Sequence, residues 1–452
     1  MQTNSTTLQD EAVSGAEKPL HYALAALGSR GDLMPILWAA KQLEAKGHKV
    51  TILANPFFAD DIAKCGLNLQ PVGTAKEWVD HISDKRFWKQ STSLPTTTAI
   101  VERSLPQFNE AMMSAQKKHG AIDAVINSPL AIGAAVVAEK MNIPSITVHP
   151  TAYTFWLSKN LPVMDVGAIP LLIKKVAQHT PQFVLKPIFS AVRKLALNKI
   201  FLPKINPFRE AIGLPPITDF YKEAWANERG AHAVLAPQWY VGASPDWPKN
   251  LQTFNFPVDG LPQEHIAKDV DEFLKDGVAQ GQKTAVFTFG GDVDAKGYVA
   301  NAIKASQQLG LRAIIISPNK AGMETAEGNK DILHAKHIPY EKLLGRCALF
   351  VHHGGVGTIS HAVEAGVPQI VMPRIGDQVD NAHKARRLGV AEVISTKDAA
   401  TPGGYARAMK AVLGSQTMTR NAKLAQELSR SFTPKQSFVD WVAQQVRHPS
   451  LS

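Results

Sequence analysis

A glycine-rich run between residues 350 and 358 has the residue types and order of an anion-binding turn. An apolar stretch leads into His352 and His353, glycines follow, and residues 361 to 365 continue as a helix. The first amides of a helix point their N–H groups at an anion, and glycines without Cβ let the backbone approach phosphate oxygens. A turn histidine can donate to the same charge. The run predicts a pyrophosphate site formed by His353, Gly354, Gly355, Gly357 and Thr358, with His352 either a further contact or only a neighbour at the strand end.

A carboxylate and an amide follow this turn as Asp377-Gln378. A carboxylate accepts two hydrogen bonds while an amide both donates and accepts, so the pair suits the vicinal hydroxyls of a sugar. Taken alone, the pair would be a solvated loop. Its distance from the glycine-rich turn favours the sugar-binding interpretation.

A second glycine-containing turn, Gly28-Ser29-Arg30-Gly31-Asp32, comes after the first predicted strand. One interpretation is a tight turn in which Asp32 only lies near the start of a helix. The other makes this turn part of the reaction centre, where a carboxyl group screened from water would have a raised pKa and could accept a proton. His149, at the end of another predicted strand, is the alternative base.

A third glycine pair, Gly290-Gly291, ends the strand predicted at 284–289 and could offer N–H groups to phosphate. Asp292 and Asp294 after it resemble a metal-binding Asp-x-Asp pair. Because a helix terminus and a histidine are available to hold the pyrophosphate, we expect no metal and no cofactor.

The elements that position these residues follow a repeated strand–helix pattern in both halves of the chain. Apolar runs at 21–27, 49–54, 124–127, 145–149 and 233–236 alternate with helix-like segments, which is typical of a parallel sheet. The pattern stops in the Pro- and Gly-rich stretch 241–264 and restarts with runs at 284–289, 312–317, 348–352, 369–372 and 391–395. The sequence predicts an α/β protein of two doubly wound domains, 19–245 and 265–430, with a disordered tail at 1–18 and a linker at 246–264.

The segment from Trp156 to Arg209 differs from this pattern, because it is helix-like and far richer in basic than in acidic residues. One interpretation is a set of amphipathic helices packed on the first domain. The other adds an apolar acceptor pocket, including Trp156, near a membrane surface.

Composition excludes several classes of protein. The 452 residues are 45% hydrophobic and 19% charged, which indicates a globular chain, and no apolar run is long enough to span a bilayer. The polar first 18 residues do not resemble a signal peptide, and two distant cysteines fit a reducing compartment, so we expect a cytoplasmic protein with possible contact at the inner membrane face. The net charge of +10 is spread without a nucleic-acid motif, so we expect no nucleic-acid partner. No G-x-G-x-x-G follows the first strand, which disfavours a dinucleotide-dependent oxidoreductase.

The run at 350–358 resembles the donor-binding signature of family 1 glycosyltransferases with the GT-B fold, and the order and spacing of 364–368 and 373–378 are similar as well. The resemblance implies a first domain that binds the acceptor and a second that binds the nucleotide sugar. It implies that His353 contacts the pyrophosphate, that Asp377 and Gln378 contact the donor sugar, and that the backbone at Ile338 holds the nucleobase. Where plant members carry a ribose-binding glutamate, this chain has His361. By the same resemblance, residues 431–452 form a helix that packs back on the first domain.

The first turn resembles the GSxGD of the sterol-glycosylating, antibiotic-glycosylating and rhamnolipid-forming branches, which implies that Asp32 is the base. Elements between 202 and 259 resemble the rhamnosyltransferase subunit that forms rhamnolipids. These similarities imply an inverting hexosyltransferase that uses a UDP- or dTDP-sugar and a hydrophobic acceptor such as a hydroxy fatty acid, lipid or sterol. The alternative is a non-catalytic subunit that binds a nucleotide sugar. The predicted donor-binding residues also include Gly28, Ser29, Gly31, Gly290 and Gly291, and the predicted acceptor-binding residues are His149 and Trp156.

Overall fold

The computed structural model describes residues 18–87, 90–155, 182–227, 230–244, 247–262, 265–290, 296–317 and 320–447. The predicted tail therefore lies almost entirely outside the described residues. So do Trp156, Gly291, Asp292 and Asp294.

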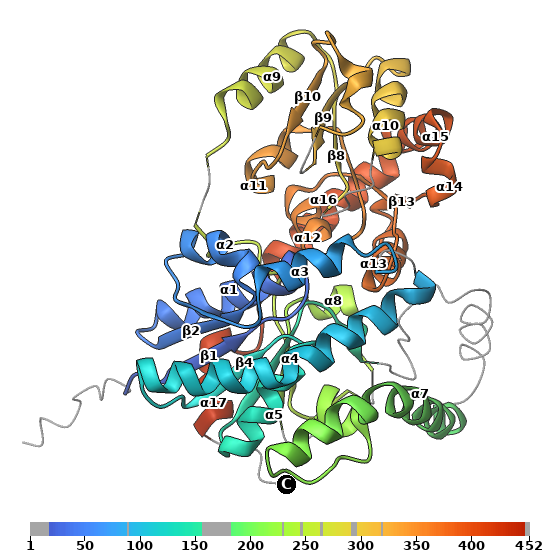
Figure 1. Ribbon diagram of the computed structural model, residues 1–452. Coiled ribbons are helices and arrows are strands. Elements are labelled where there is room, and N and C mark those ends of the chain that lie inside the picture. Colours follow the sequence, from blue (N-terminus) through green and yellow to red (C-terminus); the bar gives the residue numbers. More distant parts are fainter. Residues whose placement is uncertain are drawn as a thin grey trace, which may run out of the picture.

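Two lobes, each built on one parallel sheet, lie one above the other (Figure 1). The lower lobe holds a seven-stranded sheet in the order β3-β2-β1-β4-β5-β6-β7. Its strands are β1 (His21–Ala25), β2 (Lys49–Ala54), β3 (Leu69–Pro71), β4 (Ala124–Asn127), β5 (Ser145–His149), β6 (Ala231–Val234) and β7 (Leu251–Thr253). Its helices are α1 (Arg30–Glu44), α2 (Ala59–Lys64), α3 (Ala75–Ser83), α4 (Gln90–His119), α5 (Ile132–Met141), α7 (Gln182–Ala211) and α8 (Gln238–Val241).

The upper lobe holds a six-stranded sheet in the order β10-β9-β8-β11-β12-β13. Its strands are β8 (Thr284–Thr288), β9 (Arg312–Ile316), β10 (Ile332–Ala335), β11 (Leu349–His352), β12 (Gln369–Val371) and β13 (Ala391–Val393). Its helices are α9 (Lys268–Ala279), α10 (Lys296–Gln308), α11 (Tyr340–Leu343), α12 (Val356–Ala365), α13 (Asp377–Arg387), α14 (Thr396–Ala399), α15 (Pro402–Leu413) and α16 (Gln416–Ser431). The two-domain α/β fold predicted from the sequence is confirmed.

The central strands of both sheets are buried from end to end, as their continuous apolar sequences require. Strand order reverses between β1 and β4 in one sheet and between β8 and β11 in the other. Ligands of open parallel sheets bind outside the carboxyl ends of the strands at such a reversal. The turn at Gly28 and the turn at His353 follow β1 and β11, so each lies at the reversal of its own sheet.

The chain crosses between the lobes twice, and the first crossing begins at a later residue than the predicted linker does. The predicted linker at 246–264 includes β7, which pairs with β6 and so belongs to the first sheet. The last helix, α17 (Phe438–Arg447), lies back in the lower lobe, where Phe438 contacts Trp38 of α1 with ring centroids 5.1 Å apart. None of the described helices is both long and apolar enough to cross a membrane.

Candidate active site

The turn after β1 fixes Asp32 at the start of α1. Ser29 is the N-cap residue, and its Oγ accepts a hydrogen bond from the Gly31 N–H at 3.2 Å. Asp32 Oδ2 in turn accepts from the Ser29 N–H at 2.8 Å and from the Ser29 hydroxyl at 3.0 Å. Gly28 has a φ of +125°, and a Cβ there would lie 2.3 Å from Asp32 Oδ2, so only glycine fits. Asp32 therefore completes a capping box at the start of α1. The first interpretation of this turn had placed Asp32 near a helix start.

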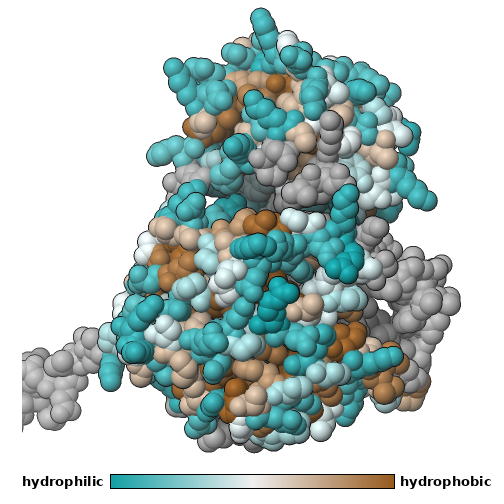
Figure 2. All heavy atoms as spheres, in the orientation of Figure 1, coloured by the Kyte–Doolittle hydropathy of each residue, from teal (hydrophilic) through white to brown (hydrophobic). Residues whose placement is uncertain are grey.

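The Asp32 carboxyl group also has an altered acidity. Burial raises its pKa, while the hydrogen bonds from Ser29 partly oppose the change. Its charge reaches the upper lobe, because Asp32 is one of the groups that raise the pKa of Asp377. The charge of the neighbouring Arg30 also reaches the upper lobe, where it acts to lower the pKa of Tyr340. Asp32 and Asp377 therefore lie near each other on opposite lobes. Figure 2 shows a hollow between the lobes on one face of the molecule.

The turn after β11 leaves the start of α12 open. Gly354 has a φ of +91°, and a Cβ there would lie 2.9 Å from Val371, so glycine is required. The N-cap residue, Gly355, has no side chain to cap the helix. Among the described residues, the N–H groups of Val356 and Gly357 donate to no backbone carbonyl, while the N–H of buried Thr358 bonds the Gly355 carbonyl at 3.0 Å. Open amides at a helix start form an anion site.

His353 lies against the backbone of Gly355 in this turn and of Gly290, which follows β8. A Cβ on Gly290 would lie 2.9 Å from the imidazole, and one on Gly355 would lie 2.7 Å from Nε2. Burial lowers the pKa of His353 to about 4, so the ring is neutral near pH 7. Its Nδ1 is buried and has no hydrogen-bond partner among the described residues. An anion at the start of α12 would favour the protonated ring and supply a partner.

His352 has a different position from its neighbour. Its Nδ1 accepts from the Gly354 N–H at 3.1 Å, so in the neutral ring Nε2 carries the proton and donates to Gln369 Oε1 at 3.0 Å. Burial lowers the pKa of His352 to about 3, which keeps the ring neutral. Both nitrogens are occupied within the protein. His352 therefore shapes the turn, and the structure does not support the predicted contact with the donor.

Asp377 and Gln378 begin α13 beside the glycine-rich turn. Asn381 Nδ2 donates to Asp377 Oδ2 at 2.8 Å and to the Gly354 carbonyl at 3.1 Å, so one buried amide joins the carboxylate to the turn. Burial and the Asp32 charge raise the pKa of Asp377 to about 6. Gln378 Oε1 accepts from the Arg374 N–H at 2.9 Å, which directs its oxygen to the backbone. The sequence analysis missed Asn381, although its i,i+4 spacing from Asp377 places both on one helix face.

The alternative base, His149, is held in a closed chain of hydrogen bonds. His232 Nε2 lies 3.1 Å from the Asn227 carbonyl, which can only accept, so His232 Nδ1 accepts from His149 Nε2 at 3.1 Å. His149 Nδ1 then accepts from the Thr154 hydroxyl at 2.7 Å. Burial lowers the pKa of His149 well below its usual value. With both nitrogens occupied inside the first domain, His149 is a poor candidate for the base or for an acceptor contact.

The predicted nucleobase contact, Ile338, lies just before α11. The Ile338 side chain is buried in the upper core, so only its backbone is available to a ligand. Tyr340 follows it and packs against His361 with ring centroids 5.5 Å apart. His361 thus belongs to an aromatic contact rather than projecting alone.

Aromatic residues of the lower lobe extend toward α13. Burial, Asp377 and Asp380 raise the pKa of Tyr153, and Lys384 Nζ lies 5.9 Å from the centre of the Tyr240 ring. Lys384 is paired with Asp380 at 2.5 Å, and both side chains are nearly inaccessible to solvent. The sequence analysis missed these residues because nothing in their spacing links the two lobes.

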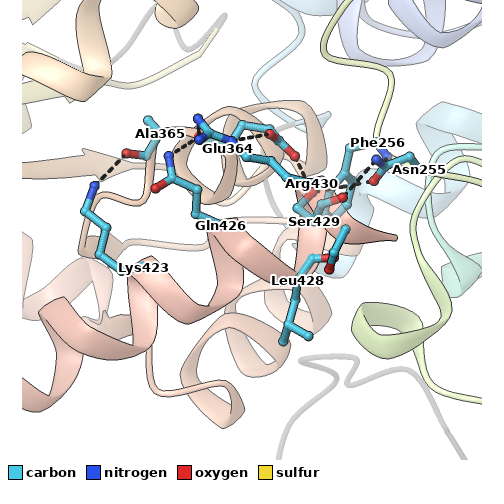
Figure 3. A network of polar contacts seen from close by, with 10 residues as sticks. Asn255, Phe256, Glu364, Ala365, Lys423, Gln426, Leu428, Ser429 and Arg430 are labelled. Atoms are coloured by element: carbon cyan, nitrogen blue, oxygen red, sulfur yellow. Dashed lines mark hydrogen bonds and ion pairs between the residues drawn. The ribbon is translucent and has the colours of Figure 1, made fainter. Parts of the chain in front are cut away.

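The far end of α12 is connected to the crossing between the lobes (Figure 3). Gln426 Nε2 on α16 donates to the Glu364 carbonyl, 2.6 Å away, and the Ser429 hydroxyl donates to the Glu364 carboxylate. The Ser429 carbonyl accepts from Asn255 Nδ2 at 3.1 Å, just after β7. The helix that begins at the anion site therefore ends at the point where the chain passes between lobes.

A mainly apolar cavity adjoins the Gly28 turn in the lower lobe. Its lining includes Leu27, Leu33, Phe58 and Trp78, with Arg103 and other polar side chains at its edge. Its free space is about the size of one water molecule.

A metal site was not expected from the sequence. Within the ranges that the structure describes, no three or more His, Cys, Asp or Glu side chains are grouped to hold a metal ion. Asp292 and Asp294 lie outside those ranges, so the expectation stays a prediction.

Two family models match the chain, one on each lobe. Residues 22–155 match the glycosyltransferase family 28 N-terminal domain, and residues 299–443 match the erythromycin biosynthesis protein CIII-like C-terminal domain. The vancomycin aglycone glucosyltransferase of Amycolatopsis orientalis is 28% identical over 374 residues, which cover 81% of this chain and 84% of that one. The sterol 3-beta-glucosyltransferase of Candida albicans is 24% identical over 84% of this chain and 25% of its own.

Solved structures share the fold. The glycosyltransferase VinC in complex with dTDP aligns with a TM-score of 0.68 and 16% identity, covering 96% of this chain and 100% of that one. The glycosyltransferase of kitacinnamycin aligns with a TM-score of 0.67 and 21% identity, covering 95% and 100%. With a matching domain on each lobe, in this order along one chain, the protein belongs to the family 1 glycosyltransferases of the GT-B fold.

Proposed function

We propose that the protein is an inverting glycosyltransferase that moves rhamnose or glucose from a UDP- or dTDP-sugar to a hydroxyl of a hydrophobic acceptor. The acceptor class is a hydroxy fatty acid, lipid or sterol. The observation that carries this proposal is the arrangement of two turns across one hollow, with Asp32 below and the open start of α12, His353 and Asp377 above.

The donor diphosphate would lie at the start of α12. The N–H groups of Val356 and Gly357 and the unpartnered Nδ1 of His353 support this placement. These groups meet charge that grows on the leaving phosphate, so their interaction is stronger in the transition state than in the ground state. In our proposal they balance the diphosphate without a metal ion or other cofactor.

The donor sugar would lie between the diphosphate and α13. Asp377 would accept hydrogen bonds from its hydroxyls, with Asn381 holding the carboxylate in place at 2.8 Å. Gln378 keeps an NH₂ group to donate while its oxygen bonds the backbone.

Asp32 would act as the base. It would take the proton of the acceptor hydroxyl while that oxygen attacks the anomeric carbon, and the bond to the diphosphate oxygen would break on the opposite face. One base and one in-line leaving group give inversion without a covalent intermediate. The raised pKa of Asp32 supports this role, because a base works best when its pKa approaches the working pH.

The sterol-glycosylating relative supports a hydrophobic acceptor. One acts on the vancomycin aglycone and another on a sterol, as their names state.

Thermal stabilisation by UDP and dTDP tests the donor site, because a ligand that binds only the folded state raises the melting temperature. We expect a shift with at least one of the two nucleotides, a much smaller shift in His353→Ala, and no shift with NAD. The stabilising nucleotide is then used, as its glucose or rhamnose conjugate, to screen sterol and hydroxy fatty acid acceptors. Absence of any shift with either nucleotide would contradict the donor site.

A further inference from the structure

The first half of α7 exposes apolar side chains to solvent. Leu195 is 74% exposed, Val192 is 57% exposed and Val184 is 36% exposed. At 100° per residue these three positions lie within about 80° of one another around the helix, so they share one face. Phe183, although 80% exposed, lies on another side of the helix. Figure 2 shows brown side chains at the lower right, where Figure 1 places α7.

The second half of α7 holds the helix in place. Leu197, Phe201 and Ile205 are buried in the core of the lower lobe, and Phe201 stacks on Phe220 with ring centroids 4.0 Å apart. Arg209, whose side chain is buried, forms an ion pair at 2.6 Å with Glu139, which is partly exposed. The helix is thus anchored by one end, and its exposed apolar side chains belong to the other.

The charge of α7 has one sign along almost its whole length. It carries six basic residues before its first acidic residue, Glu210. Those basic residues are Lys186, Arg193, Lys194, Lys199, Lys204 and Arg209. Lys194 is half-exposed and lies 3.9 Å from Asp219, and Lys199 is exposed. A helix that combines exposed apolar groups with lysines and lacks acidic ones lies at the interface of anionic membranes.

We propose that the first half of α7 is a docking surface for an anionic phospholipid bilayer. Val184, Val192 and Leu195 would enter the boundary between headgroups and acyl chains, and Lys199, which lies on the same side of the helix, would contact phosphate groups. Side chains that project from a helix suit a continuous lipid surface better than a peptide, which needs a groove. Bilayers also dissolve apolar acceptors of the kind proposed above, although the docking surface does not depend on that proposal.

Vesicle binding by the full chain tests the proposal. The probe is a set of vesicles of mixed phosphatidylcholine and phosphatidylglycerol, compared with pure phosphatidylcholine, at low and high salt and without any donor. We expect binding to the mixed vesicles that weakens with salt. Leu195→Asp should lower the partition coefficient by about tenfold or more, because it removes an apolar side chain and adds a negative charge. Lys199→Glu should lower it by at least about fivefold.

Matched variants in the upper lobe are the controls. Val278 on α9 is 77% exposed, a fraction similar to that of Leu195, and Lys304 on α10 is exposed as Lys199 is. Val278→Asp and Lys304→Glu should leave vesicle binding unchanged. Because all four positions are exposed, the variants should fold, and their melting temperatures verify this.

Three results would overturn the proposal. The first is equal vesicle binding by wild type and Leu195→Asp. The second is an equal loss in the α7 and control variants, which would indicate attraction by net charge alone. The third is a lower melting temperature, or a change from dimer to monomer, in Leu195→Asp without a change in vesicle binding. That result would assign the face to an intramolecular contact or to a second copy of the chain. Since no donor or acceptor is present, failure here leaves the glycosyltransferase assignment intact.

Discussion

Replacing Asp377 by Asn should stabilise the upper lobe while weakening transfer. Burial and the charge of Asp32 raise the pKa of Asp377 from 3.8 to about 6, so the folded protein holds this proton more tightly than the unfolded chain does. Between these two values the folded state binds more protons, and stability falls as the pH rises. The full cost of ionising Asp377 is therefore present above pH 6 and absent below about pH 4.

The size of the effect follows from the change in pKa. A shift of roughly two pKa units corresponds to about 3 kcal/mol, and because the side chain is half-buried we reduce this to about 1–2 kcal/mol. Asn keeps a side-chain oxygen for the hydrogen bond from Asn381 and carries no charge. For a domain of this size the gain corresponds to a rise in melting temperature of about 3–6 °C near pH 7.5.

Thermal melts of wild type and Asp377→Asn from about pH 4 to pH 8 measure this difference. The gain should shrink below pH 6 and vanish near pH 4, while turnover with the donor falls because a ligand for the sugar hydroxyls is lost. Asp380→Asn is the control on the same helix. It leaves buried Lys384 without its partner at 2.5 Å and should destabilise by about 3–5 kcal/mol. Equal melting temperatures near pH 7.5, or a gain that persists at pH 4, would refute the reasoning.

Four further variants separate chemistry, binding and packing. His353→Ala should lower turnover about 100-fold or more with the fold intact, as loss of a single oxyanion donor does; near-normal turnover would remove His353 from the mechanism. Asp32→Asn should abolish most turnover. It should leave the dissociation constant of the nucleotide, which calorimetry can measure, within about threefold of the wild-type value. Gly355→Ala should weaken nucleotide binding, because its Cβ would lie 2.7 Å from His353 Nε2; unchanged binding would show that the ring moves without consequence. His149→Phe should lower stability by about 1–3 kcal/mol, since His232 and Thr154 lose a partner, with turnover per folded molecule unchanged, and a specific loss of turnover would return His149 to the chemistry.

The sequence predicted the central strands well because they are continuous apolar runs. Among the described strands it missed β3, β7 and β10, which are short and partly exposed at sheet edges, so their apolar pattern is weak. It placed β6 at 233–236, whereas the strand is Ala231–Val234. The buried His232 interrupts the apolar run, and its hydrogen bonds to His149 and to the Asn227 carbonyl explain why a polar residue is tolerated there.

The candidate site was predictable where one turn carries it and unpredictable where distant segments meet. The spacing around His353 indicated an anion site from the sequence alone. The different positions of His352 and His353 were not predictable, because Gln369, which accepts a hydrogen bond from Nε2 of His352, lies on the next strand. The effect of Asp32 on Asp377 likewise depends on how two lobes face each other, which no local pattern encodes.

The contacts at the far end of α12 limit how the lobes can move. Asn255 on the outgoing crossing bonds Ser429 beside the returning one, and Gln252 bonds the Gln436 carbonyl at 3.2 Å. Two chain segments fastened side by side act as one pivot, so rotation about that pivot is easier than sliding one lobe over the other. Glu364 joins the pivot to a helix whose other end faces the donor site. The hollow between the lobes should therefore open and close by rotation about this pivot. Because α12 runs from the pivot to the donor site, it would couple that rotation to the position of the groups that bind the diphosphate.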